Sequence, residues 1–202
     1  MKFIEYFSEG GFIMYPLLFC SVVVWGVFIE KVWFLSRFKK DFKGLHNKVI
    51  NLLEDGKVLE CIGLVKSARP YLETPFLAVL EGRKLEKEEW EKSISRKLSE
   101  TQLVLKRFLW LLGTIGNLAP FIGLFGTVMG IIKSFDSMAK SGKTGFAVVS
   151  SGLAEALIAT AAGILVAVVA VLFYNFFQSQ INSLNLRIKN NLEELVLKVE
   201  KN

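Results

Sequence analysis

Three long stretches without a charged residue constrain this chain more than any other feature of its sequence. They cover residues 10–29, 108–132 and 156–186. Each is long enough to cross the hydrocarbon core of a bilayer, since a helix needs roughly 20 apolar residues to do so. The chain still carries 22% charged residues, so its apolar residues are gathered in blocks. The sequence predicts an all-α membrane protein with three transmembrane helices and excludes a simple soluble enzyme.

Residues that bind metals or form disulfides are scarce. The two cysteines, Cys20 and Cys61, form neither a disulfide framework nor a CxxC metal motif, and His46 is the only histidine. We therefore expect no metal site and no cofactor.

One short motif is typical of nucleotide-binding proteins, but neither the residues before it nor its location fits such a site. Gly142-Lys143-Thr144 matches the end of a phosphate-binding loop, but that loop requires a glycine where the chain has Ser137. The triplet also lies in a predicted turn outside the membrane. We expect no nucleotide binding and no enzymatic activity.

Basic residues orient the spans. Arg37, Lys39, Lys40 and Lys43 follow the first block, and cytoplasmic loops are enriched in such residues. No signal-peptide cleavage site follows the block, so we expect a retained helix. The N-terminus is then periplasmic and the C-terminus cytoplasmic. The predicted order is an interfacial segment (1–14), span one (15–34), a cytoplasmic helical loop (35–107), span two (108–138), a periplasmic turn (139–146), span three (147–177) and a cytoplasmic helix (178–202). Most of the net charge of +6 lies in that loop, which makes a nucleic-acid partner unnecessary.

Two helical stripes flank the later spans. We expect Pro70 and Pro75 to break the helices of the loop. Beyond them, helical spacing links Trp90, Ile94, Leu98, Thr101, Leu105 and Phe108. It predicts a helix that continues without interruption into span two. A second stripe contains Ile181, Leu184, Ile188, Leu192, Leu195 and Val199. We expect both long helical extensions to pack together or against a neighbouring subunit, and we assign no site to them.

Small residues form a stripe on each of spans two and three. Span two has Gly116, Pro120, Gly123, Gly126 and Gly130, and span three has Gly152, Ala156, Ala159, Gly163 and Ala167. Such residues let helices approach closely, and Gly126 and Gly130 have a spacing typical of packed membrane helices. We expect these stripes to pack helices or to form the wall of a pore.

Three polar residues beside the stripes are candidates for an ion pathway. Glu155 stands at the edge of an apolar stretch, and a buried carboxylate there usually faces a protein interior or an aqueous path. Alternatively, it reaches water or pairs with a lysine of the outer turn. Thr127 and Thr160 could form a polar lining, or each could bond to its own preceding turn.

Residues 11–18, 119–131 and 152–163 carry a resemblance to a known family. The chain resembles the proton-channel subunits ExbB and TolQ, with MotA as a more distant relative. The resemblance implies a pentamer around the single helices of two copies of a smaller ExbD- or TolR-like partner. It implies that spans two and three line the pore, that the partner's aspartate carries the proton, that Thr127 and Thr160 face it, and that Glu155 is a functional acid. MotA has four spans, which disfavours a flagellar stator.

The expected function is a proton-driven motor subunit in the bacterial inner membrane. It would act through a TonB- or TolA-like protein on the outer membrane, and a TolQ-type or gliding-motor role stays open. The main alternative is an oligomeric scaffold that conducts no ion. An autonomous channel is disfavoured because Glu155 is the only acid in span three (147–177) and no inverted repeat is visible in the sequence. The residue types do not distinguish H⁺ from Na⁺.

Overall fold

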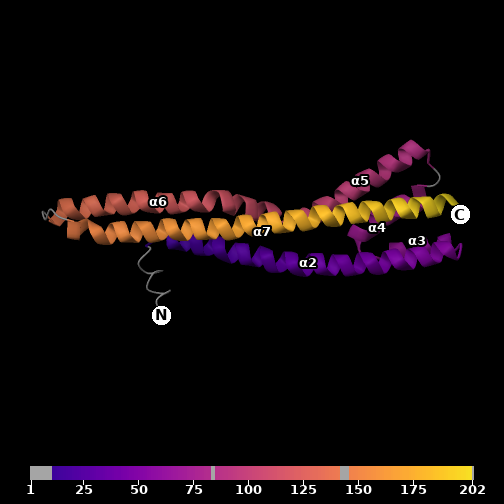
Figure 1. Ribbon diagram of the computed structural model, residues 1–202, viewed down its shortest axis with the longest axis horizontal. Helices are drawn as coiled ribbons and strands as arrows, with labels where there is room; N and C mark the ends of the chain where they lie inside the picture. Colours follow the sequence, from indigo (N-terminus) through magenta and orange to yellow (C-terminus); the bar gives the residue numbers. More distant parts are fainter. Residues whose placement is uncertain (1–10, 83–84, 142–145, 202) are drawn as a thin grey trace. The chain divides into compact units, whose positions relative to one another are not determined.

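The computed structural model describes residues 11–82, 85–141 and 146–201, and within these ranges it contains helices and no strands (Figure 1). In chain order the helices are α2 (Met14–Glu54), α3 (Val58–Lys66), α4 (Pro70–Glu81), α5 (Lys87–Lys106), α6 (Leu109–Ser141) and α7 (Phe146–Lys201). Three of them are long and apolar enough to cross a membrane: Met14–Glu54, Leu109–Lys140 and Gly152–Glu200. The predicted all-α fold with three such helices is confirmed.

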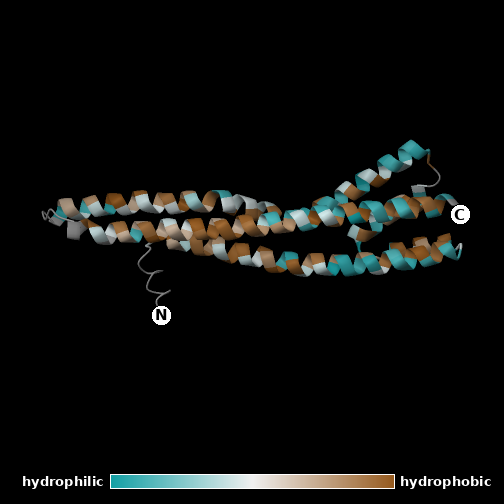
Figure 2. Ribbon diagram, viewed as in Figure 1, coloured by the Kyte–Doolittle hydropathy of each residue, from teal (hydrophilic) through white to brown (hydrophobic). Residues whose placement is uncertain are grey.

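The chain divides into two compact units. The first, which we call the apolar unit, comprises residues 1–29 and 108–176. The second, the charged unit, comprises residues 30–107 and 177–202. Helices α2 and α7 contribute to both. Figure 2 shows hydrophobic residues over most of α6 and the first half of α7, whereas α5 is mostly hydrophilic.

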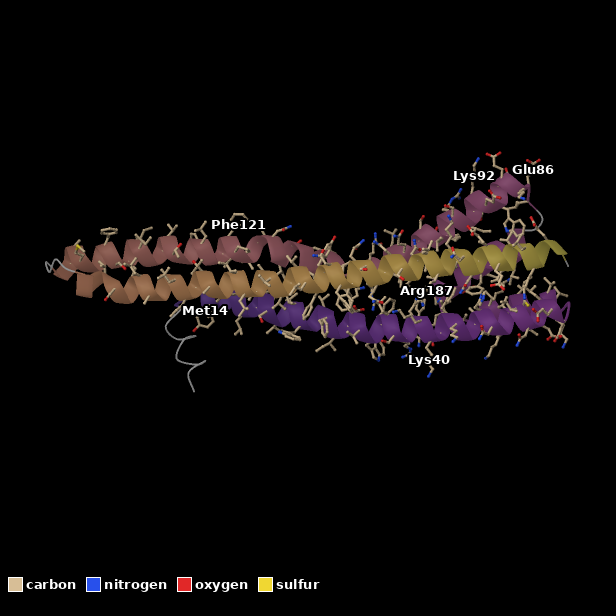
Figure 3. The ribbon with its side chains drawn as sticks, viewed as in Figure 1. Met14, Lys40, Glu86, Lys92, Phe121 and Arg187 are labelled. Atoms are coloured by element: carbon tan, nitrogen blue, oxygen red, sulfur yellow. The ribbon has the colours of Figure 1, made fainter. Side chains whose placement is uncertain are left out.

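The apolar unit buries small side chains and exposes large ones. Ala119 and Ala159 are buried where α6 and α7 meet, and Ala170 of α7 is also buried. Large apolar residues such as Phe121 and Leu165 are exposed, and Figure 3 shows Phe121 projecting from α6 away from α7. This distribution suits a helix pair whose outer surface meets lipid or other apolar helices.

The charged unit has the opposite arrangement, with large side chains inside. α4 packs against both α3 and α5. Phe38 stacks on Phe42 and Tyr71, and Phe76 lies against Phe42. The predicted C-terminal stripe is confirmed, because all six of its members are buried: Ile181, Leu184, Ile188, Leu192, Leu195 and Val199.

The prediction that Pro75 breaks a helix is wrong. Pro70 begins α4, but Pro75 lies inside it. A proline there removes the N–H that would bond to the carbonyl four residues earlier, which belongs to Tyr71. Tyr71 O instead accepts a hydrogen bond from Thr101 Oγ1 of α5 at 3.4 Å. Thr101 has a single hydroxyl proton and a closer acceptor in Lys97 O of its own helix, at 3.1 Å, so α5 compensates only in part for the lost bond.

The prediction of an uninterrupted helix into span two is also wrong. α5 ends at Lys106, Arg107 has an extended ψ of 144°, and Phe108 has a left-handed φ of 60° before α6 begins. The carbonyl of Leu105, left without a helical donor, accepts a hydrogen bond from Lys31 Nζ at 2.8 Å. Lys31 is completely buried, and a continuous helix would not offer its ammonium a free carbonyl. The helix break therefore leaves the Leu105 carbonyl free to accept a hydrogen bond, and the buried Lys31 ammonium donates it.

Candidate functional site

Helices α6 and α7 approach each other closely along their small residues. A Cβ atom on Gly163 would lie 2.6 Å from the carbonyl oxygen of Ala119 and 3.0 Å from the Cα of Gly123. A Cβ on Gly130 would lie 2.6 Å from the Cβ of Ala156. Distances this short leave no room for a side chain. We call this contact the α6–α7 seam.

The structure places most of the predicted small residues in this seam. Gly116, Gly123, Gly126, Gly130, Ala156, Ala159, Gly163 and Ala167 are buried. Gly152 and Pro120 are half-buried, and a Cβ on Gly152 would meet Ser134 Oγ. The seam holds one chain together, and a pore wall at these positions stays a prediction.

The two threonines donate to different carbonyls. Thr160 Oγ1 crosses the seam and donates to Gly123 O at 2.9 Å. Thr127 Oγ1 donates within its own helix to Leu124 O at 2.6 Å. Both side chains are half-buried. Because each hydroxyl uses its proton on the backbone, its oxygen is left as an acceptor. The threonines can therefore receive a hydrogen bond from a protonated acid without rearranging.

Glu155 lies where three segments meet. Lys133 of α6 places its Nζ 2.9 Å from one carboxylate oxygen and 3.3 Å from the other. On another side is Gly11, just before α2, where a Cβ would lie 2.0 Å from Glu155 Oε1. Gly11 has a φ of 67°, so this position favours glycine both for its backbone and for its space. Glu155 therefore pairs with a lysine of α6 that precedes the predicted outer turn, and a place for Glu155 on an ion pathway stays a prediction.

A second ionic cluster, at the start of the charged unit, was missed by the sequence reasoning. Glu30 Oε1 accepts a hydrogen bond from Arg107 Nε at 3.0 Å, and Lys31 Nζ lies 3.8 Å from Glu30 Oε2. The Arg107 guanidinium also lies over the Phe34 ring, 4.4 Å from its centroid. The signal was available as an adjacent acid and base at the end of span one. Its partner at Arg107 is distant in sequence and could not be identified.

Within the described ranges, no group of three or more His, Cys, Asp or Glu side chains is placed to hold a metal ion. His46 stacks on Phe42, and its Nε2 lies 3.8 Å from a Glu194 oxygen. The buried Cys61 thiol donates to Val49 O at 3.7 Å, and burial raises its pKa. Both residues take part in packing the charged unit.

A family profile and several individual relatives indicate the same protein family. The profile of the MotA/TolQ/ExbB proton channel family matches residues 67–190. The chain is 31% identical to the biopolymer transport protein ExbB of Pseudomonas putida over 198 residues, which are 94% of this chain and 59% of that relative. It is 30% identical to the ExbB-like 3 protein of Synechocystis over 172 residues, 84% of this chain and 82% of that relative.

A further match is to the Tol-Pal system protein TolQ of Pseudomonas aeruginosa. It is 43% identical over 83 residues, which are 41% of this chain and 36% of that protein. The family profile covers more than half of the chain, and the α6–α7 seam, Thr127, Thr160 and Glu155 all lie within it. The chain belongs to the MotA/TolQ/ExbB proton channel family.

Proposed function

We propose that this multi-pass inner-membrane protein is the channel subunit of a motor that uses the proton motive force to energise a TonB- or Tol-type system. The observation that carries the proposal is the place of Glu155. Its carboxylate lies beside the α6–α7 seam in the apolar unit, where it pairs with Lys133 and only 26% of its side chain is exposed. Keeping a carboxylate in such surroundings is costly, and carboxylates kept there commonly serve ion movement.

The proposed assembly is a pentamer of this chain around two copies of a one-span partner. Relatives named ExbB and TolQ support a partner of the ExbD or TolR type. Large apolar residues exposed on α6, such as Phe121 and Leu124, provide a surface for neighbouring helices or lipid. The basic residues after span one, Arg37, Lys39 and Lys40, are exposed, and such residues support a cytoplasmic location for the charged unit.

In the proposed mechanism, protons move through the interface between this chain and its partner. Moving one charge through 100 mV releases about 2.3 kcal/mol, enough to bias a rotation or a tilt of the partner helix. Protonation of the partner's acid removes its charge, and the oxygens of Thr127 and Thr160 can then accept its O–H. The partner helix steps to the next subunit and pulls on a TonB- or TolA-like protein.

The test replaces the side chains of Thr160 and Glu155, to which the proposal gives the most direct roles. Thr160→Ala and Glu155→Gln are each expected to abolish coupled transport in cells while the complex still assembles, as judged by copurification. Thr114→Ala is the matched control, because Thr114 is an exposed threonine of α6 away from the seam. Full activity in both test variants would contradict the proposal.

The seam also supports a second candidate, a scaffold that conducts no ion. Its glycines are explained by packing alone, since those of α6 contact α7 and those of α7 contact α6 within the same chain. A scaffold predicts that Thr127→Ala and Thr160→Ala are tolerated and that no small one-span protein copurifies with the chain. The same cell assay and copurification therefore distinguish the two candidates.

A further inference from the structure

A cavity of about 420 Å³ lies between α2 and α7 within the charged unit, and we call it the α2–α7 pocket. Lys39 and Lys43 of α2 line it, together with Arg187 of α7, which is labelled in Figure 3. Among the described residues, no acidic side chain contributes to its wall. Three positive charges therefore line one small volume with no negative charge among them.

These cations differ from other basic residues of the charged unit in having no carboxylate partner. Arg37 and Arg69 share Asp41, at 3.9 and 3.5 Å. Within the described ranges, neither Lys43 nor Arg187 forms an ion pair. The positive-inside bias counts basic residues and does not require their side chains to gather around one cavity. Like charges repel when they are brought together, and a bound anion would relieve that repulsion.

The wall of the pocket also contains neutral polar groups. Lys39 Nζ donates to Gln180 Oε1 at 2.9 Å, and the amides of Asn47 and Asn191 add further hydrogen-bond donors. The side chain of His46, another lining residue, is only 9% exposed, and its Nδ1 has no hydrogen-bond partner among the described residues. Buried polar atoms are normally satisfied. The pocket wall therefore includes a buried polar atom for which the described chain supplies no partner.

The charge and the size of the pocket suit a compound that carries phosphate. A guanidinium binds phosphate through two parallel hydrogen bonds, and a lysine ammonium adds a point charge. A carboxylate would neutralise one of the three cations, whereas a phosphate ester carries a charge of about −2 near pH 7. A volume of about 420 Å³ falls within the range of roughly 300–1,000 Å³ that is typical of small-molecule sites. The pocket therefore has room for more than a single phosphate group.

The position of the pocket along α2 favours a soluble compound over a lipid headgroup. Glu30 is the first charged residue after the uncharged stretch 10–29, so the hydrocarbon core is expected to end near it. Lys39 follows Glu30 by nine residues of α2, or about 14 Å at 1.5 Å per residue. The headgroup layer extends only roughly 5–8 Å beyond the hydrocarbon core. A lipid phosphate would therefore lie short of Lys39 and farther still from Lys43.

We propose that the α2–α7 pocket is a binding site for a small soluble compound that carries phosphate groups. Arg187 and Lys43 donate hydrogen bonds to its phosphate oxygens, and the bound ligand links α2 to α7. The site is independent of the proposed function, because a motor subunit and a scaffold could both contain it.

The experiment measures the binding of radiolabelled inorganic pyrophosphate, a small soluble anion with two phosphate groups. The native complex is purified in detergent through this chain and is studied by equilibrium dialysis at physiological ionic strength, which screens weak attraction to exposed charges. The wild-type complex is expected to bind pyrophosphate saturably, with one site per copy of this chain.

Lys43→Met and Arg187→Met each remove one charge from the pocket. Both side chains are exposed, so the buried core of the charged unit stays intact. Each variant is expected to bind pyrophosphate about tenfold more weakly or worse, because a charge-assisted hydrogen bond is lost. Arg187→Lys keeps the charge without the two-pronged geometry and is expected to lose less affinity than Arg187→Met. Lys57→Met is the matched control, because Lys57 is an exposed lysine of the charged unit that does not line the pocket.

Three results would overturn the inference. The first is that the wild-type complex binds no pyrophosphate. The second is that Lys57→Met weakens binding as much as Lys43→Met and Arg187→Met do, which would indicate general attraction to a basic surface. The third concerns phosphatidylglycerol that copurifies with the complex, which native mass spectrometry quantifies. Its amount is expected to be the same in all variants, and a loss confined to Lys43→Met and Arg187→Met would identify a lipid headgroup as the occupant instead.

Discussion

The apolar unit and the charged unit share two long helices, α2 and α7, yet their interiors have little in common. In the apolar unit, α6 and α7 meet through glycine and alanine, and residues as large as Phe121 and Leu165 are exposed. In the charged unit, Phe38, Phe76 and Leu192 are buried. The same helix, α7, therefore changes its packing from small residues to large ones along its length.

The difference follows from the medium that surrounds each unit. In water, burying a large apolar side chain stabilises the fold, so the charged unit has its largest residues inside. In lipid that driving force between helices is absent, and close backbone contact through small residues takes its place. A change in side-chain size is therefore expected to act in opposite directions in the two units: truncation destabilises the charged unit, and enlargement destabilises the apolar unit. Three predictions test this, from the largest expected effect to the smallest.

In the charged unit, truncating a buried side chain should have the largest effect. Leu192→Ala is expected to lower the free energy of unfolding by about 2–5 kcal/mol, because Leu192 is completely buried and its loss leaves a cavity. Leu197→Ala, a matched change of an exposed residue on the same helix, is expected to stay within about 0.5 kcal/mol. Denaturant unfolding in detergent measures both. Equal losses would show that exposure does not separate the two positions.

In the apolar unit, adding a single methyl group should be harmful at the seam. Gly163→Ala is expected to destabilise the protein by about 1–3 kcal/mol, because the new Cβ would press on the backbone of Ala119 and Gly123. Gly26→Ala is the control, since a Cβ at Gly26 meets nothing within 4 Å. There the exchange should be neutral or stabilising by about 0.5–1 kcal/mol. Thermal unfolding measures the stability of both variants, and a Gly163→Ala protein more stable than Gly26→Ala would contradict this prediction.

The smallest expected effect is a pH dependence confined to the charged unit. Burial lowers the pKa of His46 below its ordinary 6.5, against the opposing effect of Glu194 and together with that of Lys198. The unfolded chain therefore binds more protons than the folded one just below pH 6.5. The contribution of His46 to stability is complete above pH 6.5 and is lost as the pH falls from 6.5 towards the lower pKa of the folded state.

Unfolding of the wild type and of His46→Phe, measured from about pH 7.5 to about pH 5.5, isolates this contribution. Carboxylates other than Glu194 affect both proteins alike, so the difference in slope belongs to His46 and its pairing with Glu194. A wild-type protein that gains stability relative to His46→Phe as the pH falls would contradict the assignment.

Long periodic segments were predictable from the sequence, and single contacts were not. The C-terminal stripe from Ile181 to Val199 was identified correctly because helical spacing of apolar residues specifies which face is buried. The same rule failed at Phe108, where the backbone turns to a positive φ. It also failed at Pro75, where α4 continues and the Tyr71 carbonyl lies within 3.4 Å of Thr101 Oγ1 of α5. Both exceptions depend on residues from another helix.

In the candidate site, likewise, the sequence identified the residues but not their contacts. Glu155, Thr127 and Thr160 could be selected from the sequence, because polar residues in apolar spans are costly and few. Their bonds could not be assigned, since Thr127 bonds within its own helix and Thr160 bonds across the seam. The spacing of the two threonines along the chain does not distinguish these choices.

The sequence by itself determined the three apolar helices, the small-residue stripes and the acid beside them. All three follow from the period of one helix and from the high cost of charge among apolar residues. Only the tertiary structure decided that the stripes of α6 and α7 meet each other, that Lys31 is buried against the end of α5, and that Lys133 and Gly11 enclose Glu155. Such pairings depend on how helices distant in sequence come together in space, which periodicity along a single helix does not specify.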